Sequence, residues 1–238
     1  MNNLDNYYGR IFTETEISES LRKEAVASPS MKKVNHKLFC NRCGQSVSKA
    51  NTLPTGNLYC RECLVFGRNT SQSKLYTFKQ IPFPKIKSLI WQGQLTPYQT
   101  EVSQSLLNGI DKKDNLLVHA VTGAGKTEMI YQSVAKVIDK GGCVCIASPR
   151  IDVCLELHKR LSRDFSCSIT LMHGDSEPYQ RAPLIIATTH QLLKFHQAFD
   201  LLIIDEVDAF PFVDNAVLYY GVNQAIKCNG VKIFLTAT

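Results

Sequence analysis

A short segment near the centre of the chain restricts its fold more than any other feature. Residues 116–130 read LLVHAVTGAGKTEMI, in which an apolar strand runs into a glycine-containing loop and a helix follows at once. Glycines allow consecutive backbone NH groups to point inward around a phosphate, and the N-terminus of a helix adds positive potential there. The segment therefore predicts a phosphate-binding loop between the strand and the helix.

The residues of this loop have distinct expected roles. Lys126 reaches the β and γ phosphates of a nucleotide, and Thr127 offers its hydroxyl to Mg²⁺. Ala120 stands where the first glycine of such loops is usual, at a position where only small size is needed. We expect the nucleotide to be held by Thr122, Gly123, Ala124, Gly125, Lys126 and Thr127.

An acidic sequence follows a second apolar strand. In DLLIIDEVDAF the strand ends in the acids Asp205, Glu206 and Asp208. Ligands of open α/β folds bind at the carboxyl ends of strands, so we expect these acids beside the phosphate loop. Asp205 would hold Mg²⁺ through water, and Glu206 would polarise the water that attacks the γ-phosphate. Lys126, Asp205 and Glu206 are thus the predicted catalytic residues; a solvated acidic cap is the alternative.

Strands and helices alternate from Leu95 to the C-terminus. Strands are expected near residues 116–120, 143–147, 168–172, 184–188, 201–205 and 232–236, and helices near 97–108, 126–139, 151–163 and 214–227. The strands are apolar on both faces, which is typical of a parallel sheet covered on both sides. The predicted fold class is therefore α/β, with helices on both faces of a parallel sheet.

Four of the nine cysteines form two CxxC pairs, Cys40 with Cys43 and Cys60 with Cys63. The spacing is that of a zinc ribbon or treble-clef knuckle, in which two such turns bring four thiolates to one tetrahedral ion. Gly44 permits the tight turn after the first pair. Four unliganded thiols are the alternative, but a module this small needs the folding energy of a metal. We predict a structural Zn²⁺ site.

The other five cysteines are expected to be small buried hydrophobes. Cys143 and Cys145 alternate along a strand, Cys154 and Cys228 fall in expected helices, and Cys167 lies in a loop or at a strand edge. His173 follows a strand, where we expect a polar loop; contact with nucleic acid is the alternative.

Positive charge is concentrated in the N-terminal part of the chain. The net charge is +6, but residues 31–94 contain eleven Lys or Arg against one acid, whereas residues 95–238 contain thirteen bases and fifteen acids. Base stacking and phosphate contact are typical of single-strand binding, so the basic stretch is a candidate nucleic-acid surface. A small module made soluble by lysines and cored by its own aromatics is the alternative. These aromatics are Phe39, Tyr59, Phe66, Tyr76, Phe78, Phe83 and Trp91.

Composition divides the chain into four expected parts. These are an N-terminal tail with a short helix (1–35), a four-cysteine zinc-binding module (36–68), a basic linker or edge strand (69–94) and the nucleotide-binding lobe (95–238). The longest aliphatic runs are far shorter than the roughly 20 residues of a membrane span, and the N-terminus has no apolar signal core. We expect a soluble, cytoplasmic protein.

Residues 95–238 resemble superfamily 2 helicases, whose motifs occur here in order. LTPYQ corresponds to the adenine-recognising Q-type motif with Gln99, AVTGAGKT to motif I, SPR to motif Ia, TTHQLL to motif Ic, DEVD to motif II and TAT to motif III. The resemblance implies a first RecA-like lobe. It also implies that Asp208, Thr236 and Thr238 couple nucleotide state to movement.

Hydroxyls and a guanidinium at strand ends mark the candidate DNA contacts of this lobe. They belong to Ser148, Arg150, Thr188 and Thr189 in the SPR and TTHQLL motifs. Such groups suit a phosphodiester backbone. Ordinary helix capping is the alternative.

A CxxC…CxxC module ahead of LTPYQ, TGAGKT and DEVD is similar to the competence protein ComFA family, a motor associated with DNA uptake in naturally transformable Gram-positive bacteria. This resemblance implies an ATP-dependent single-stranded DNA translocase, a DNA-dependent ATPase that uses ATP, Mg²⁺ and Zn²⁺. It implies work at the cytoplasmic face of the membrane, with ComFC, the channel protein ComEC and the recombination loader DprA as partners.

Two other functions stay open. A PriA-like replication-restart helicase resembles this core but keeps its zinc cysteines within the second motor lobe. A non-catalytic adaptor would use the zinc module for docking and the phosphate loop as a nucleotide sensor. The chain stops at Thr238, within motif III, so the second RecA-like lobe and its arginine finger lie outside it. Because such fingers raise rates by about 10³ to 10⁵, we expect this chain to bind nucleotide and DNA but to hydrolyse ATP slowly.

Overall fold

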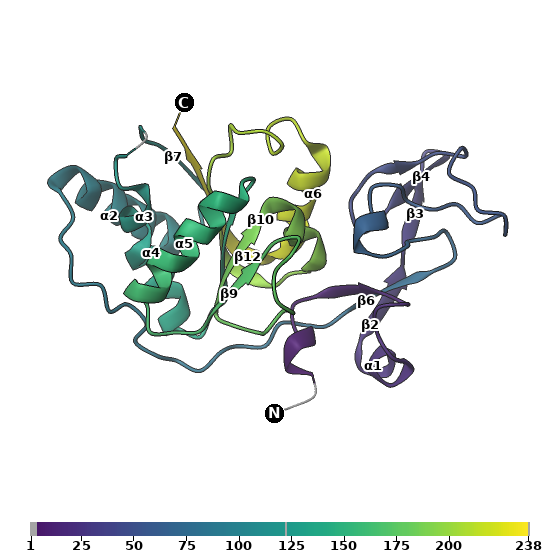
Figure 1. Cartoon of the computed structure of the whole chain (residues 1–238), viewed down its shortest axis with the longest axis horizontal. Helices are drawn as coiled ribbons and strands as arrows, with labels where there is room; N and C mark the ends of the chain where they lie inside the picture. Colours follow the sequence, from purple (N-terminus) through teal and green to yellow (C-terminus); the bar gives the residue numbers. More distant parts are fainter. Residues whose placement is uncertain (1–3, 122, 238) are drawn as a thin grey trace.

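The computed structural model describes residues 4–121 and 123–237. An α/β lobe begins at Pro97, and a smaller N-terminal part built on two three-stranded sheets lies beside it (Figure 1). Residues 78–96 connect the two parts along the side of the lobe and contain no helix or named strand. No helix within the described ranges is long and apolar enough to cross a membrane.

Six parallel strands form the sheet of the lobe, in the order β7-β12-β11-β8-β10-β9. They are β7 (Leu116–His119), β8 (Val144–Ser148), β9 (Ile169–Met172), β10 (Leu184–Thr188), β11 (Phe199–Ile204) and β12 (Ile226–Thr236). The predicted parallel sheet is confirmed. Because only β12 separates β7 from β11, the loops that follow these two strands meet at one edge of the sheet.

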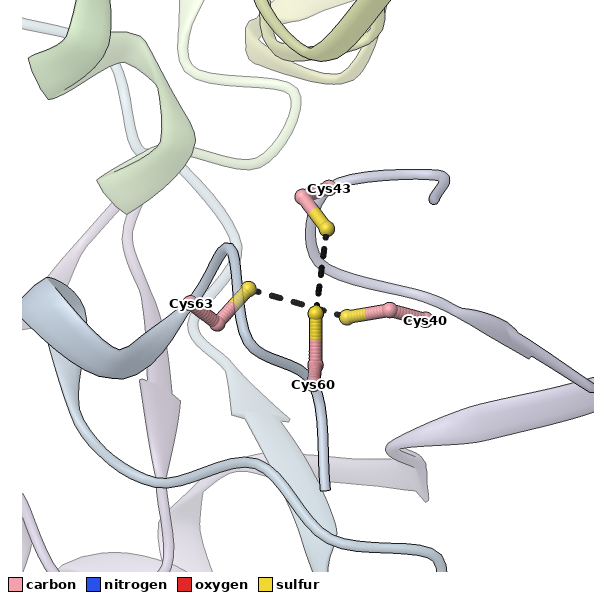
Figure 2. Close-up of side chains that lie close together, drawn as sticks. All are labelled: Cys40, Cys43, Cys60 and Cys63. Carbon is pink, nitrogen blue, oxygen red and sulfur yellow. Dashed lines mark hydrogen bonds between the residues drawn. The ribbon is translucent and has the colours of Figure 1, made fainter. Parts of the chain in front are cut away.

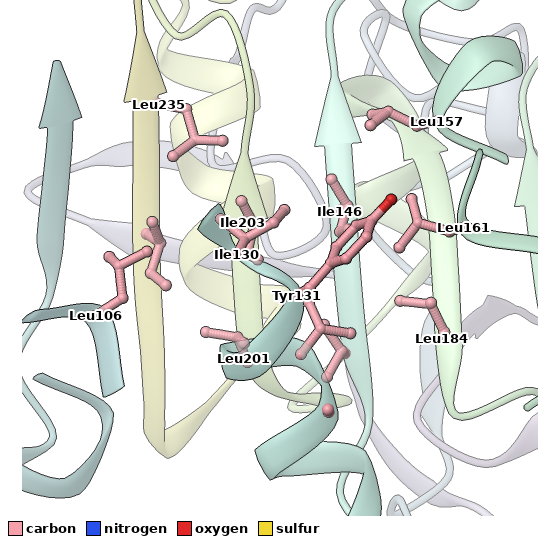
Figure 3. Packing of buried hydrophobic residues seen from close by; sticks show 14 of the residues in the cluster. Leu106, Ile130, Tyr131, Ile146, Leu157, Leu161, Leu184, Leu201, Ile203 and Leu235 are labelled. Carbon is pink, nitrogen blue, oxygen red and sulfur yellow. The ribbon is translucent and has the colours of Figure 1, made fainter. Parts of the chain in front are cut away.

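Helices cover both faces of this sheet (Figure 1). They are α2 (Pro97–Lys112), α3 (Lys126–Met129), α4 (Tyr131–Asp139), α5 (Ile151–Asp164), the 3-10 helix η3 (Thr189–Lys194) and α6 (Ala216–Ala225). On one face, Leu106, Tyr131 and Leu161 pack with strand residues into a single apolar core (Figure 3). On the other face, η3 and α6 contribute Leu192 and Leu218 to a second core.

Two helices of the lobe differ from their predictions. The helix expected over 126–139 is divided into α3 and α4 at Ile130. The helix expected over 214–227 ends at Ala225, and β12 begins at the next residue, so Cys228 lies exposed in a strand rather than in a helix. Apolar periodicity could not locate the boundary between α6 and β12, because a short apolar run fits a helix end and a strand equally well.

The N-terminal part contains more regular structure than predicted. Strands β1 (Ile11–Thr13), β6 (Lys74–Thr77) and β2 (Val26–Pro29) form an antiparallel sheet in the order β1-β6-β2, and the helix α1 (Glu19–Glu24) connects β1 to β2. Residues 1–35 are thus more than a tail with a short helix, and the expected linker supplies the central strand of a sheet. Strands of three or four residues with a partner far along the chain leave no periodic signal.

A second small sheet carries the first cysteine pair. It contains β3 (Met31–Val34), β4 (Lys37–Cys40) and β5 (Ser46–Val47), and the 3-10 helix η2 (Leu64–Phe66) follows the second pair. A further 3-10 helix, η1, spans Asp5–Tyr7 near the N-terminus. The seven aromatics of the basic stretch are all buried or half-buried, so they core the structure rather than forming an open stacking surface.

The connecting segment is fixed to the lobe. The Ser88 NH and hydroxyl both donate to Asp139 Oδ1, at 2.8 and 2.7 Å. The Ile90 NH donates to the Asp164 carbonyl at 2.9 Å, and the Trp91 ring meets Tyr131 edge-on with centroids 5.4 Å apart. These contacts attach the connecting segment to the side of the lobe on which α4 and α5 lie.

Candidate nucleotide site and zinc centre

The phosphate loop connects β7 to α3, as its sequence predicts. Gly123 and Gly125 adopt φ angles of 82° and 77°, in the left-handed region that favours glycine. A Cβ at Gly125 would lie only 2.4 Å from Gln99 Nε2, so this position also needs glycine for space. Thr122, predicted to bind nucleotide, lies outside the described residues.

Gln99 joins the N-terminus of α2 to the phosphate loop. Thr96 caps this helix, and its NH donates to Gln99 Oε1 at 2.9 Å in a capping box. The other end of the amide donates from Nε2 to the Ala124 carbonyl at 2.8 Å. The structure therefore places Gln99 at the loop, where the Q-type motif predicts it; contact with adenine stays a prediction.

Asp205 and Glu206 follow β11 at the same edge of the sheet. Burial raises the pKa of Asp205, and the charge of Lys126 opposes that rise. Asp205 Oδ1 accepts the Glu206 NH at 3.0 Å, and Glu206 has a positive φ of 54°. Burial also raises the pKa of Glu206, while the nearby Arg150 opposes it.

A pocket of about 330 Å³ brings the predicted nucleotide and catalytic residues together. The pocket is lined by four of the predicted loop residues and all three acids: Gly123, Gly125, Lys126, Thr127, Asp205, Glu206 and Asp208. Ala124 and Gln99, also predicted to hold the nucleotide, do not line it. Thr127 and Asp205 offer the hydroxyl and carboxylate oxygens that suit Mg²⁺. A lysine, a hydroxyl and carboxylates around one pocket can bind a nucleoside triphosphate and activate a water molecule.

Arg160 lines the same pocket and was not predicted from the sequence. Its guanidinium forms an ion pair with Glu128, and Nη1 donates to Thr127 Oγ1 at 3.4 Å. Arg160 lies on α5, far along the chain from the loop. No motif or spacing marks it, because only the packing of α5 against the first helices of the lobe brings it there.

The predicted DNA contacts do not all reach the surface. Arg150 is 54% exposed, but it lines the nucleotide pocket and its Nη1 lies 3.7 Å from Glu206 Oε1. Ser148 and Thr189 are fully buried, whereas Thr188 is half-buried at the end of β10. The structure therefore does not present the side chains of Ser148 and Thr189 to DNA. Ser148 acts locally instead, because its hydroxyl accepts the Arg150 NH at 3.3 Å.

The three residues predicted to couple nucleotide state to movement lie near this edge or outside the described part. Asp208 lines the nucleotide pocket. Thr236 ends β12, and its carbonyl accepts the Ala120 NH at 3.1 Å at the start of the phosphate loop. Thr238 is outside the described residues. Their coupling role stays a prediction.

The four cysteines of the two CxxC pairs converge on one point (Figure 2). The sulfurs of Cys40 and Cys63 lie 3.6 Å apart, those of Cys43 and Cys60 lie 3.5 Å apart, and all four lie within 4.8 Å of one another. Zn–S bonds of about 2.3 Å in a regular tetrahedron place sulfurs about 3.8 Å apart. All four side chains are buried, so this geometry fits a closed structural Zn²⁺ site.

Donors around the cysteines also suit thiolates. Asn69 Nδ2 donates to Cys40 Sγ at 3.1 Å, and the Arg42 NH donates to the same sulfur at 3.4 Å. Outer donors of this kind orient metal ligands and favour their charged form.

The remaining cysteines are mostly the small buried hydrophobes that were expected. Cys143, Cys145 and Cys154 are buried, and burial raises the pKa of Cys143 to about 12. Cys167 is half-buried in a loop. His173 lies in the polar loop after β9, where its Nδ1 accepts the NH of Asp175 at 3.3 Å. The predicted polar loop is thus present, and contact of His173 with nucleic acid stays untested.

Family models and curated relatives match most of the chain. Residues 96–238 match the DEAD/DEAH box helicase family, and residues 7–77 match the competence protein ComFA N-terminal domain. Competence protein ComFA of Streptococcus pneumoniae (strain ATCC BAA-255 / R6) is 62% identical over 99% of this chain and 54% of that protein. Competence protein ComFA of Bacillus subtilis (strain 168) is 38% identical over 95% and 51%. The chain spans about half the length of these relatives.

The lobe also resembles solved helicase-type structures. The Sulfolobus solfataricus SWI2/SNF2 ATPase core in complex with dsDNA has a TM-score of 0.52 and 18% identity, covering 66% of this chain and 34% of that one. At this identity the likeness shows the RecA-like fold alone. By its lobe the chain belongs to the DEAD/DEAH box helicases, and its N-terminal part matches the competence protein ComFA N-terminal domain over residues 7–77.

Proposed function

We propose that the chain is the nucleotide-binding part of an ATP-dependent single-stranded DNA translocase that drives DNA uptake during competence. The pocket in which Lys126, Thr127, Asp205 and Glu206 meet carries the proposal. Lys126 binds the β and γ phosphates, and Glu206 takes the proton of the attacking water. Mg²⁺, when held by Thr127 and Asp205, supplies charge neutralisation for the phosphates.

The electrostatics of Glu206 support its role as the base. Burial raises its pKa, which makes its carboxylate more basic than one in water. Arg150 Nη1 lies 3.7 Å from the carboxylate and opposes this rise, while the guanidinium of Arg150 also pairs with Asp152.

Similarity to competence proteins supports the choice of DNA and partners. Single-stranded DNA is the proposed substrate, with ComFC, ComEC and DprA as partners at the cytoplasmic face of the membrane. Within the lobe, Thr188 and Arg150 are the proposed contacts to the DNA backbone, because both follow strands at the same edge of the sheet and neither side chain is enclosed. A second RecA-like lobe would complete the motor.

Nucleotide binding and hydrolysis by two variants test the proposal. We expect Lys126→Ala to abolish binding of a fluorescent ATP analogue, and Glu206→Gln to keep binding but to lower single-turnover hydrolysis by about 10²-fold or more. Asp175→Asn, an exposed acid beyond β9, is the control for loss of one charge. Hydrolysis unchanged by Glu206→Gln and unaffected by single-stranded DNA would favour the non-catalytic adaptor instead.

A further inference from the structure

Arg42 lies inside the first cysteine pair and is fully buried. Its Nη1 donates to the Phe66 carbonyl at 2.6 Å and lies 3.3 Å from Glu16 Oε2. Its Nε donates to the Leu193 carbonyl at 3.4 Å. The other ten basic residues of the stretch 31–94 are exposed. A buried charge is costly unless its partners are in place, so Arg42 holds these acceptors together.

The three acceptors belong to three different parts of the molecule. Phe66 ends η2, directly after the second cysteine pair. Glu16 lies in the turn that follows β1 of the N-terminal sheet. Leu193 belongs to η3 of the lobe, and its side chain packs into the same cluster as the four cysteines. One guanidinium thus joins both zinc turns to the motor lobe.

Further contacts fix the first zinc turn against the lobe. The Tyr220 hydroxyl of α6 donates to the Asn41 carbonyl at 3.1 Å. The Tyr220 ring lies so close to Gly44 that a Cβ there would meet it at 2.3 Å. Helix α6 itself packs against η3, since a Cβ at Gly221 would lie 3.2 Å from the Leu193 side chain. The zinc turn, η3 and α6 therefore form one packed unit.

The chain on either side of η3 leads to the proposed DNA contact and to the nucleotide pocket of the lobe. The helix begins directly after Thr188, the proposed DNA contact, and leads into β11, which is followed by Asp205. A metal-bound turn holds the backbone of Arg42 in place, because two of its neighbours are ligands of the same ion. Without the ion the turn loosens, and the bond from Arg42 to Leu193 is the direct route by which η3 is released.

We propose that Arg42 is a positioning residue that transmits zinc binding through η3 to the DNA-binding edge of the motor lobe. The DNA part of this proposal rests on the proposed function; the structural part does not. Zinc then controls the grip of the lobe on DNA without itself lying at the DNA. Ala120 and Ala124 of the phosphate loop pack in the core on the opposite face of the sheet from η3 and α6, so we expect nucleotide binding to be unaffected.

Arg42→Met tests the link, because methionine keeps an apolar stem but cannot donate to Leu193. Arg61→Met is the matched control, since Arg61 is exposed within the second cysteine pair. We expect the R42M chain to retain zinc, measured by release to a chromogenic chelator. We expect amide hydrogen exchange in peptides covering 189–195 to accelerate on the order of tenfold, and single-stranded DNA affinity to fall by a similar factor. Affinity for the ATP analogue should match that of the R61M chain.

Zinc removal from the unchanged chain supplies an independent reading. Removal of zinc by a chelator should accelerate amide hydrogen exchange over residues 189–195 in the unchanged chain. In the R42M chain, the same treatment should cause little further acceleration. The proposal is overturned if chelation leaves this exchange unchanged, or if zinc-loaded R42M behaves like R61M. Should R42M fail to hold zinc, the chelation result on the unchanged chain decides alone. If the unchanged chain binds no DNA, the proposed function fails, while the exchange data still test Arg42.

Discussion

Arg150 has a neighbour that its motif does not predict. Its motif predicts a DNA contact, whereas its guanidinium lies 3.7 Å from the Glu206 carboxylate in the nucleotide pocket. A nearby cation favours the ionised carboxylate, so Arg150 lowers the pKa of Glu206 against the effect of burial. The charges of Asp205 and Asp152 act in the same direction as burial, and that of Lys126 opposes it.

Arg150→Met is expected to shift the pH dependence of hydrolysis. Without the guanidinium the pKa of Glu206 rises further above its ordinary value, so more of the base is protonated at a given acidic pH. The acidic limb of the single-turnover rate then moves to higher pH. Lys159→Met is the control, because Lys159 is an exposed cation on α5, the helix that begins directly after Arg150. Superimposable profiles for the two variants would contradict the pairing of Arg150 with Glu206.

At the scale of elements, the contact between the zinc turn and α6 depends on one glycine. Gly44 has a φ of 75°, and a Cβ there would lie 2.3 Å from the Tyr220 ring. Gly56 has a similar φ of 82° but nothing within 4 Å of the added atom. At both positions the left-handed backbone makes alanine unfavourable by about 1–2 kcal/mol, but only at Gly44 does the added methyl also clash with a neighbour.

Gly44→Ala should therefore destabilise the chain more than Gly56→Ala. The added methyl must displace the Tyr220 ring, which costs about 1–3 kcal/mol beyond the backbone effect. Urea unfolding of the zinc-loaded proteins measures both, and Tyr220→Ala in the Gly44→Ala background should remove most of the difference. Equal destabilisation by the two alanines would mean that the zinc turn is not packed on α6.

The elements that could be predicted from the sequence are those whose signal is local. The phosphate loop, the acids after β11 and the two CxxC pairs each combine special residues with a fixed spacing, and the structure brings each set together. The sheet β1-β6-β2 has no such signal, because its strands are short and pair across long stretches of chain. The contacts of Arg42 and Arg160 likewise depend on packing between elements that are far apart in the sequence, so no residue spacing predicts them.

Across the whole molecule, the excess of positive charge and the candidate nucleotide pocket lie in different parts of the chain. Ten exposed basic residues belong to the stretch 31–94, whereas the candidate nucleotide pocket lies in the lobe, where acids slightly exceed bases. The aromatics of the basic stretch are not open for stacking. Any DNA grip by the N-terminal part must therefore come from phosphate contacts, which are strongly salt-dependent.

The hairpin of β3 and β4 offers the sharpest test of that grip. Lys32, Lys33 and Lys37 are all exposed on it. If they contact phosphates, replacing the three with glutamine should weaken single-stranded DNA binding and lower the slope of log affinity against log salt by about 2, at about 0.7 per contact. Fluorescence anisotropy across a salt series measures both quantities.

A matched triple variant in the lobe separates a local contact from a loss of net charge. Lys112, Lys113 and Lys140 are exposed at the ends of α2 and α4, away from the strand edge that carries Thr188. Their replacement by glutamine removes the same charge and should leave the salt slope close to that of the unchanged chain. Equal slopes for all three proteins would mean that the hairpin lysines make no phosphate contacts.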